Sequence, residues 1–486
     1  MADAYQFQPP PPERRDEPQI AAQRAAVRAQ IDPWVALLTD PTARREAQQQ
    51  ALVVMQERRS GLGPARIHLG DDGVPVTPNR IVVRRADVDE VVARLAAEYY
   101  APQMVSIPGL DQVCVLVGIG SGARSLRASS TVARTVPGGL AAPSHVSLLG
   151  AIRKAEGGPE PSGPSGDGRW QIPDERDERP ESAEDQGPSA EDQGPLVVVI
   201  DNGVSAEQRT DGWLAGLAST DNLDPLNVVP VDEYLDLAAG HGTFATGVVQ
   251  QVAPGARLVV RSALDTEGEG DEVDIAREIV RAARDGAEVI NLSLGFQTAD
   301  HRPPLAMEEA IRTAIRIAED DEENPRHLLV VCAAGNYGDR HPCWPAAFSA
   351  VPEFGRHVVS VAALRLDHDD DQQVVGAEWS SHGDWVTCST LGQGVVSTYV
   401  VGKESPTSDR DDPDTFGPNS WATWSGTSFA APQVAGAVVQ MVRDGRAATA
   451  REALDALLDE ARKHFETENE ASTLDGYGVP LRILPV

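Results

Sequence analysis

Three residues that are far apart in the chain have the side chains needed for nucleophilic catalysis by a serine. Asp201 follows the apolar run "LVVVI", His241 stands in "GHGTFATG", and Ser428 stands in "GTSFAAP". A serine hydroxyl is a weak nucleophile unless a neutral imidazole takes its proton, and that imidazole needs a carboxylate to fix its tautomer. The chain order Asp, His, Ser is one of those in which this triad occurs. These residues predict a hydrolase that forms an acyl-enzyme on Ser428.

Each of the three residues also has a structural interpretation. Asp201 could cap the end of a strand, His241 could begin a helix, and Ser428 could be a helix N-cap. For any one of them taken alone, the structural role is the commoner one. The three motifs together favour catalysis.

The stretch "WSGTSFAAPQVAG" (424–436) predicts a helix that begins near Ser428 and has small residues around it. The first N–H groups of a helix have no partner inside it, so the N–H of Ser428 is expected to help bind an oxyanion. Pro432 is expected to fall early enough in the helix that no hydrogen bond is lost.

The elements that position these residues begin at residue 196. Apolar runs indicate strands that are buried on both faces, and helical patterns at 272–286 and 304–320 lie between some of them. Such alternation is typical of an α/β fold with a parallel sheet covered by helices on both faces. Functional residues gather at the carboxyl ends of such strands, where Asp201 and Asn336 stand. The strand-like runs are at 196–201, 256–264, 288–295, 327–336 and 357–364.

The motifs resemble those of the subtilisin-like serine peptidases over residues 196–464. "HGTFATG" is similar to that family's His motif and "GTSFAAPQVAG" to its Ser motif. "INLSLG", "VVCAAGN" and "WSSHGDWV" resemble three further segments in the family order. The departures are Asn202 after the predicted catalytic Asp, "LGQG" at 391–394, and "FAT" within the His motif.

The resemblance implies roles for further residues. Asn336 is expected to supply the side chain of the oxyanion hole. Ser293, Leu294, Gly295 and Gly335 are expected to bind substrate. No cofactor is expected for the chemistry. Members of the family often hold structural calcium, but no ligand motif assigns it here, and no metal-binding residue is predicted.

The chain before the peptidase-like part divides into three. Residues 1–18 are Pro-rich and predict a disordered tail, and residues 19–155 predict a module with helices near 19–38 and 41–59 followed by a small α/β unit. Residues 156–195, which contain "SAEDQGP" twice, predict a disordered acidic linker. The peptidase domain is expected at 196–486.

The formal net charge of −32 argues against nucleic acid and against an anionic membrane surface as partners. No run of about 18 apolar residues predicts a membrane span, and the N-terminus lacks the apolar core of a secretory signal. The cysteines Cys114, Cys332, Cys343 and Cys388 are scattered, which indicates free thiols. We therefore expect a cytoplasmic protein.

The sequence thus predicts a serine endopeptidase with protein or peptide substrates. Two alternatives stay open: a catalytically weak scaffold that binds peptides, and a peptidase that works within a larger complex through its N-terminal module. That module is expected either to bind the peptidase as a removable prodomain or to bind a partner protein. Its linker is the expected place of self-cleavage.

Overall fold

The computed structural model describes residues 67–69, 74–96, 102–118, 141–148, 159–162, 194–228, 232–298, 301–321, 325–366, 374–404, 413–468 and 474–483. The predicted tail at 1–18 and the predicted helices near 19–38 and 41–59 lie outside these residues. No helix in the described ranges combines the length and apolar character needed to cross a membrane.

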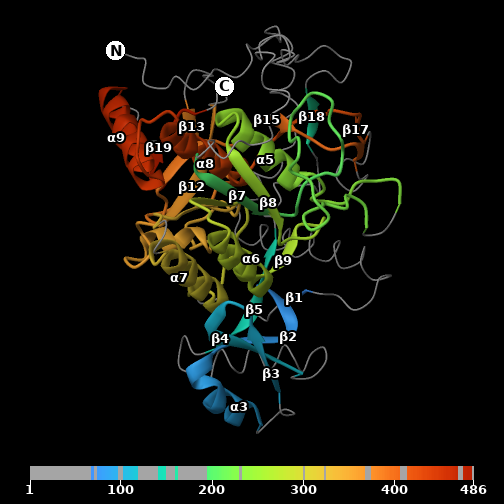
Figure 1. The fold of residues 1–486 in the computed structure, drawn as a ribbon, viewed down its shortest axis with the longest axis vertical. Coiled ribbons are helices and arrows are strands. Elements are labelled where there is room, and N and C mark those ends of the chain that lie inside the picture. The colour runs from blue at the N-terminus through green and yellow to red at the C-terminus, as the bar shows by residue number, and fades with distance from the viewer. Residues whose placement is uncertain are drawn as a thin grey trace.

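A parallel sheet forms the centre of the peptidase-like part (Figure 1). Its order is β19-β14-β12-β11-β10-β7-β8, and all six neighbouring pairs run parallel; β13 pairs antiparallel with β12. The strands are β7 (Leu196–Asp201), β8 (Arg257–Ser262), β10 (Val289–Leu292), β11 (Leu329–Ala333), β12 (Val358–Leu366), β13 (Val374–Gly376), β14 (Cys388–Leu391) and β19 (Val479–Pro480).

Helices cover both faces of this sheet. Successive side chains of a strand point to opposite faces, so Val197 and Val199 pack with α5, α8 and α9, whereas Val198 and Ile200 pack with α6 and α7. The predicted α/β fold with helices on both faces is therefore confirmed. The helices are α5 (His241–Val252), α6 (Glu272–Arg284), α7 (Leu305–Glu319), α8 (Thr427–Arg443) and α9 (Ala450–Glu468), with a 3₁₀ turn η3 (Ala346–Ala350).

Within the described residues, the N-terminal module is an antiparallel sheet with one α-helix, and it packs on α6 and α7 (Figure 1). Its order is β3-β4-β2-β5, with β1 paired to β2, and β5 continues the sheet onto β9 of the peptidase. The elements are β1 (His68–Leu69), β2 (Pro75–Arg84), η1 (Arg85–Asp87), α3 (Val88–Ala96), β3 (Gln103–Ile107), β4 (Leu110–Val117), β5 (Ala141–Leu148) and β9 (Glu269–Asp271).

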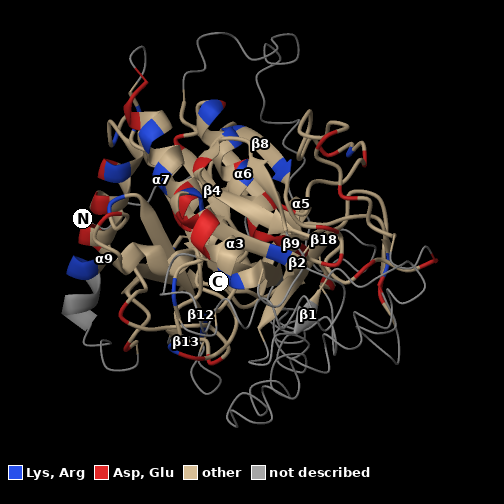
Figure 2. Cartoon of the chain, turned by 90° about the horizontal axis from the view of Figure 1, so that it is seen from below, with Lys and Arg blue, Asp and Glu red and all other residues tan. Residues whose placement is uncertain are grey.

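The two faces of the module sheet have different partners. Ile81 and Val83 of β2 pack against α3, whereas Val82 joins the same apolar cluster as Val280 of α6. Seen from the side of the module, acidic and basic residues are interspersed along α6, α7 and α9 (Figure 2). The module therefore docks through an apolar face bordered by charges of both signs.

The prediction of a disordered linker is wrong at residues 159–162. There β6 (Glu160–Ser162) pairs antiparallel with β18 (Trp421–Trp424), which also pairs with β15 (Val395–Thr398). A proline is tolerated in an edge strand because its missing N–H can face away from the neighbour, and Pro161 stands in such a strand. Because β6 is short and lacks a run of apolar residues, its sequence did not predict a strand. The remaining pair is β16 (Gly402–Lys403) with β17 (Thr415–Phe416).

Candidate active site

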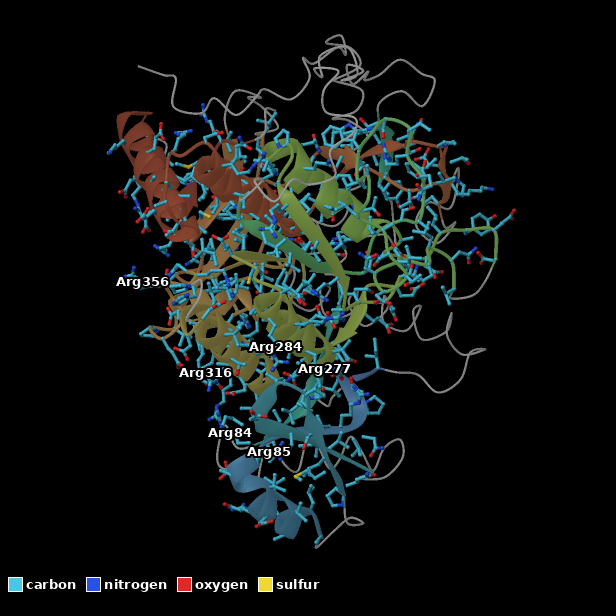
Figure 3. All side chains as sticks on the ribbon, viewed as in Figure 1. Arg84, Arg85, Arg277, Arg284, Arg316 and Arg356 are labelled. Atoms are coloured by element: carbon cyan, nitrogen blue, oxygen red, sulfur yellow. The ribbon has the colours of Figure 1, made fainter. Side chains whose placement is uncertain are left out.

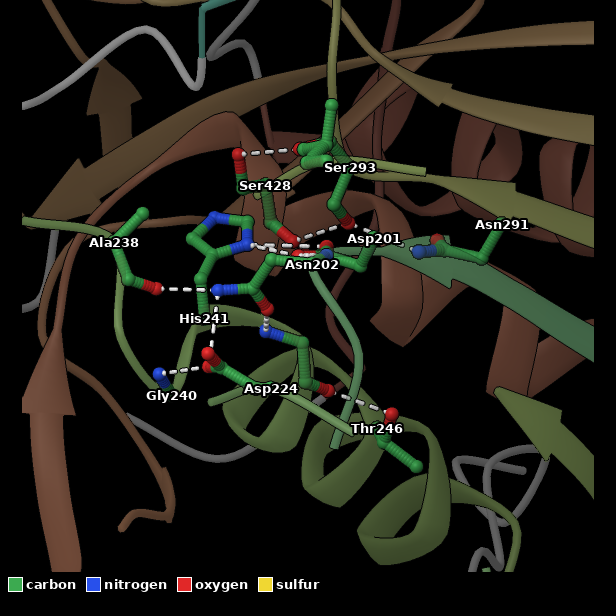
Figure 4. A network of polar contacts seen from close by, with 12 residues as sticks. Asp201, Asn202, Asp224, Ala238, Gly240, His241, Thr246, Asn291, Ser293 and Ser428 are labelled. Carbon is green, nitrogen blue, oxygen red and sulfur yellow. Dashed lines mark hydrogen bonds and ion pairs between the residues drawn. The ribbon is translucent and has the colours of Figure 1, made fainter. Parts of the chain in front are cut away.

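Asp201 and His241, which are 40 residues apart in the chain, form a buried pair. Asp201 is the last residue of β7 and His241 is the first residue of α5. The Nδ1 atom of His241 lies 2.8 Å and 3.0 Å from the two carboxylate oxygens of Asp201 (Figure 4). Because an ionised carboxylate only accepts hydrogen bonds, Nδ1 carries the proton. In the neutral ring, Nε2 then has the lone pair that a general base needs.

Asn202, noted above as a departure from the family pattern, ties the start of α5 to β7. Its Nδ2 donates to Asp224 Oδ2 (3.1 Å) and to the carbonyl oxygen of Ala238 (2.6 Å), and its Oδ1 accepts from the N–H of Gly242 (2.8 Å). Asp224 also accepts from the N–H of Gly240 (2.7 Å), as Figure 4 shows. This network holds the backbone on both sides of His241.

Gly242 is required by the close approach of β7 to α5. A Cβ atom at this position would lie 2.2 Å from the carbonyl oxygen of Gly203 and 2.9 Å from Oδ1 of Asn202. Any side chain would therefore push α5 away from β7, and with it His241 away from Asp201.

Ser428 is the second residue of α8, and its side chain lies beside the imidazole of His241 (Figure 4). Its hydroxyl donates to the carbonyl oxygen of Ser293 at 3.2 Å. Proton transfer to His241 requires the hydroxyl to turn from Ser293 toward Nε2. Catalytic hydrogen bonds often form only once substrate is bound, so the arrangement is compatible with a resting active site.

The structure corrects the expectation for Pro432. This residue is the sixth of α8, where its missing N–H deprives the carbonyl of Ser428, four residues earlier, of its helical partner. The hydroxyl of Ser293 replaces that partner and donates to the Ser428 carbonyl at 2.7 Å. Ser293 in turn accepts from Nδ2 of Asn291 at 2.9 Å. The strand that ends near Ser293 is thus bonded directly to the residue predicted as nucleophile.

Two aromatic rings enclose the imidazole. Trp424 meets His241 edge-on with ring centroids 5.5 Å apart, and Phe429 lies at 5.1 Å. His241 is 4% exposed as a result. The rings limit the directions in which the imidazole can turn.

Asn336 follows β11 and contacts the residue before Ser428. Its Oδ1 accepts from both the backbone N–H (3.0 Å) and the hydroxyl (2.8 Å) of Thr427. Holding the oxygen in this way fixes the direction in which Nδ2 presents its protons. An amide fixed beside the start of α8 can donate to a developing oxyanion together with the N–H of Ser428.

Replacing Asn336 by Leu should lower kcat by about 10²–10³ and leave KM nearly unchanged, a magnitude taken from subtilisin itself. The reason is that an oxyanion-hole amide, the predicted role of Asn336, binds charge that develops only in the transition state. Steady-state kinetics on a peptide substrate measures both constants. A variant as active as the parent would show that another group donates to the oxyanion.

Three of the four residues predicted to bind substrate follow β10, and two of them, Ser293 and Gly295, contact α8 or the N-terminal module. The hydroxyl of Ser147 in β5 lies 3.2 Å from the N–H and 3.3 Å from the carbonyl oxygen of Gly295. Leu294 is buried in the core, and Ser293 bonds Ser428 as described. Since β5 also pairs with β9, it runs between β9 and Gly295. We call this place the substrate position, after the prediction made for Ser293, Leu294 and Gly295.

The fourth residue, Gly335, has its backbone groups paired inside the protein. Its N–H donates to the Thr427 hydroxyl (3.1 Å), and its carbonyl accepts from the N–H of Ser381 (2.8 Å). Its φ of +98° and the Cys343 sulfur, 2.8 Å from where a Cβ would lie, both require glycine. Gly335 therefore orients Asn336.

The sequence did not point to several residues of this site. Asp224 acts through Gly240 and Asn202, Thr427 holds Asn336, and Trp424 packs on His241. Asp224 stands in a polar stretch without strand or helix character, so no local signal marked it. Trp424 and Thr427 lie within the quoted stretch 424–436 and could have been inferred from it.

The chain is similar in sequence to proteins named as proteinases. The thermophilic serine proteinase of Bacillus sp. (strain AK1) is 33% identical over 254 residues, which are 51% of this chain and 52% of that protein. Thermitase of Thermoactinomyces vulgaris is 29% identical over 220 residues, covering 43% of this chain and 63% of thermitase. The chain thus matches between half and two thirds of the length of these relatives.

The fold also has a solved counterpart. The structure of fervidolysin from Fervidobacterium pennivorans, described as a keratinolytic enzyme related to subtilisin, superposes with a TM-score of 0.52 and 18% identity. The superposition covers 84% of this chain and 60% of fervidolysin, and at this identity it shows the fold alone. The model of the subtilase family matches residues 192–478, which is more than half of the chain. The chain therefore belongs to the subtilase family.

Proposed function

We propose that this protein is a serine endopeptidase that uses Ser428 as nucleophile, His241 as base and acid, and Asp201 to orient His241. The observation that carries the proposal is the buried Asp201–His241 pair, whose tautomer leaves Nε2 as the basic atom beside Ser428. Membership of the subtilase family supports the same activity. A fluorophosphonate probe, which reacts with activated serines, tests it directly.

In this mechanism Oγ of Ser428 attacks the peptide carbonyl carbon while its proton passes to Nε2 of His241. The carbonyl oxygen becomes an oxyanion, to which Asn336 and the N–H of Ser428 donate. The C–N bond then breaks and the imidazolium gives its proton to the leaving amine. A water molecule, deprotonated by His241, attacks the acyl ester, and Ser428 regains its proton as the acid product leaves. These steps need only side chains and water, and no cofactor.

The substrate position favours an extended polypeptide. There β5 lies antiparallel to β9 with Ser147 opposite Gly270, and the Ser147 hydroxyl contacts the backbone of Gly295. A substrate strand would add to the same edges through backbone hydrogen bonds, which depend little on side-chain identity. We infer that substrates are protein segments that can adopt an extended form.

We also propose that the N-terminal module blocks this position in the intact chain. Asp271, which caps α6, accepts from the hydroxyls of Ser144 (2.9 Å) and Thr77 and lies 3.5 Å from the Arg80 guanidinium. Arg84 of the module pairs with Glu308 of α7 at 2.8 Å. Substrate cannot enter while β5 fills the place between β9 and Gly295.

A buried acid strengthens this contact. His145 of β5 stacks on Phe296 with centroids 5.7 Å apart, and its Nδ1 lies 3.4 Å from Oε1 of Glu272. Burial raises the pKa of Glu272, and the hydrogen bond with His145 acts in the opposite direction. The module thus supplies a polar partner to the Glu272 carboxyl group, which is buried away from water.

The bond of self-cleavage is proposed to lie between Leu148 and Pro159. The last residues of β5 lie at the substrate position, and β6 pairs with β18, whose Trp424 contacts His241. The two strands therefore approach the triad from two sides. A cut between them would leave β6 and the acidic repeat attached to the peptidase, whereas the sequence placed self-cleavage within the linker at 156–195.

Removing residues 1–158 should raise peptide hydrolysis at least tenfold relative to the uncleaved full-length chain. A tethered module competes at an effective concentration of the order of millimolar, so even weak docking excludes substrate. Initial rates of protein that begins at residue 159, which keeps β6, measure the effect. Equal rates for the two forms would contradict blocking and favour a partner-binding role for the module.

Two adjacent arginines provide a matched control that needs no deletion (Figure 3). Arg84 contacts Glu308 of the peptidase, whereas Arg85 contacts Asp111 and Ser106 within the module. Arg84→Ala should raise the rate of the full-length chain about fivefold, since a partly buried ion pair contributes about 1 kcal/mol. Arg85→Ala should leave the rate unchanged.

A reducing, cytoplasmic location is a further proposal. All four cysteines are unpaired and buried in the structure, and free thiols are typical of reducing compartments. Fractionation of cells that produce the protein, followed by detection in the soluble cytoplasmic fraction, tests the proposal.

A further inference from the structure

Three potential metal ligands meet at the edge of the main sheet where its strands begin. Glu319 ends α7, His327 precedes β11, and His357 directly precedes β12. One ligand atom from each residue lies within 4.8 Å of the other two. Asp201 and Asn336 stand at or after the opposite ends of their strands, so this cluster is separate from the active site.

His357 is oriented as a metal ligand would be. It is 7% exposed, and its Nδ1 lies 3.0 Å from the carbonyl oxygen of Leu328. Because a carbonyl only accepts, Nδ1 carries the proton and Nε2 of the neutral ring has a lone pair. A backbone carbonyl that holds the second ring nitrogen is the usual support of a ligating histidine.

The lone pair of His357 faces a carboxylate. Nε2 lies 3.5 Å from Oε1 of Glu319. In a neutral ring these two atoms are both acceptors, so a favourable contact needs either a second proton on the ring or a metal cation between them. Ligand atoms about 2.0–2.2 Å from a tetrahedral Zn²⁺ ion are about 3.3–3.5 Å apart. The observed separation matches that spacing.

His327 is held by the backbone in the same manner. Its Nε2 lies 3.2 Å from the carbonyl oxygen of Arg356, which makes Nε2 the donor and Nδ1 the atom with a lone pair. The two imidazoles stack with centroids 4.4 Å apart and 27° between their planes. His327 is only half-buried, so its ring can turn Nδ1 toward an ion shared with His357. Arg356, labelled in Figure 3, marks this edge of the molecule.

The positive charge of Arg451 next to the cluster is balanced. Arg451 of α9 donates to the same Arg356 carbonyl at 3.3 Å, and its Nε also donates to Asp455 at 3.1 Å. The guanidinium is therefore paired with a carboxylate and does not leave an uncompensated charge beside the ligands.

We propose that Glu319, His327 and His357 bind one Zn²⁺ ion, with water as the fourth ligand. Two imidazoles and a carboxylate suit zinc better than calcium, which prefers oxygen ligands. The ion would join the end of α7 to the starts of β11 and β12. It stabilises the fold and takes no part in the chemistry at Ser428.

The test uses the full-length Ser428→Ala protein, prepared without a polyhistidine tag so that neither self-digestion nor a tag interferes. Titration with ZnCl₂ should show one site per chain. At 100 times the dissociation constant, zinc should raise Tm by about 3–4 °C. CoCl₂ should give the visible absorption of tetrahedral Co²⁺, which ZnCl₂ then abolishes. An absence of both the Tm shift and the cobalt spectrum would overturn the proposal.

Variants assign the site. Glu319→Gln and His327→Gln, at exposed and half-buried positions, should fold and lose both signals. His357→Gln should lose them too, with circular dichroism reporting whether this buried position still folds. His341→Gln is the matched control, because His341 lies against another histidine, His301, with centroids 4.6 Å apart. Unchanged binding in Glu319→Gln and His327→Gln, or loss in His341→Gln, would place the ion elsewhere and refute the assignment.

Discussion

Ser428→Ala should abolish both fluorophosphonate labelling and peptide hydrolysis, with a loss of about 10⁶-fold in kcat. That magnitude is the one measured for the catalytic serine of subtilisin. The variant should fold normally, because the hydroxyl contributes one hydrogen bond, to the carbonyl of Ser293, whereas the backbone carbonyl of residue 428 still accepts from the Ser293 hydroxyl. Probe labelling followed by mass spectrometry of the modified peptide gives the result.

Ser425 supplies the control for that experiment. It lies three residues before Ser428 and is 7% exposed, and its hydroxyl accepts from the N–H of Gly394 at 3.0 Å. Ser425→Ala should keep labelling at Ser428. If the Ser428→Ala protein were labelled and cleaved peptides like the parent, the proposed nucleophile would be wrong.

Asp201→Asn should lower kcat by about 10⁴-fold while the fold is kept. The Asn side chain has nearly the same shape, but one of its terminal atoms becomes an NH₂ donor. An NH₂ group that faces Nδ1 of His241 favours the tautomer in which Nε2 carries the proton. Such an imidazole cannot take the proton of Ser428. Active-site titration together with kcat separates this effect from a loss of folded protein.

Asp224→Asn tests whether Asp201 fixes the tautomer of His241 or only holds the loop in place. Asp224 holds Gly240 and Asn202 at 2.7 Å and 3.1 Å without touching the imidazole. Asp224→Asn should therefore lower kcat much less than Asp201→Asn does. Equal losses in the two variants would show that Asp201 only positions the loop.

The sequence by itself determined the main sheet and the resemblance of its motifs to the family. Runs such as 196–201 and 357–364 are almost continuously apolar, with Asp201 and His357 at their ends and Ser360 inside the second, which is the local signature of a parallel strand covered on both faces. Their positions match β7 and β12 closely. The carboxyl ends of these strands also indicated where Asp201 and Asn336 would gather, because all parallel strands end at one edge.

Only the tertiary structure decided which polar groups pair across the chain. The Ser293 hydroxyl replaces the N–H that Pro432 lacks, across 135 residues, and Ser147 meets Gly295 across 148. Neither contact has a periodic or compositional signal. Local sequence encodes strand and helix because their hydrogen bonds and buried faces repeat at short intervals. A single contact between distant segments has no such repeat. The pairing of β6 with β18 and the cluster at His357 could therefore not be predicted from local sequence, because only the packed fold brings their residues together.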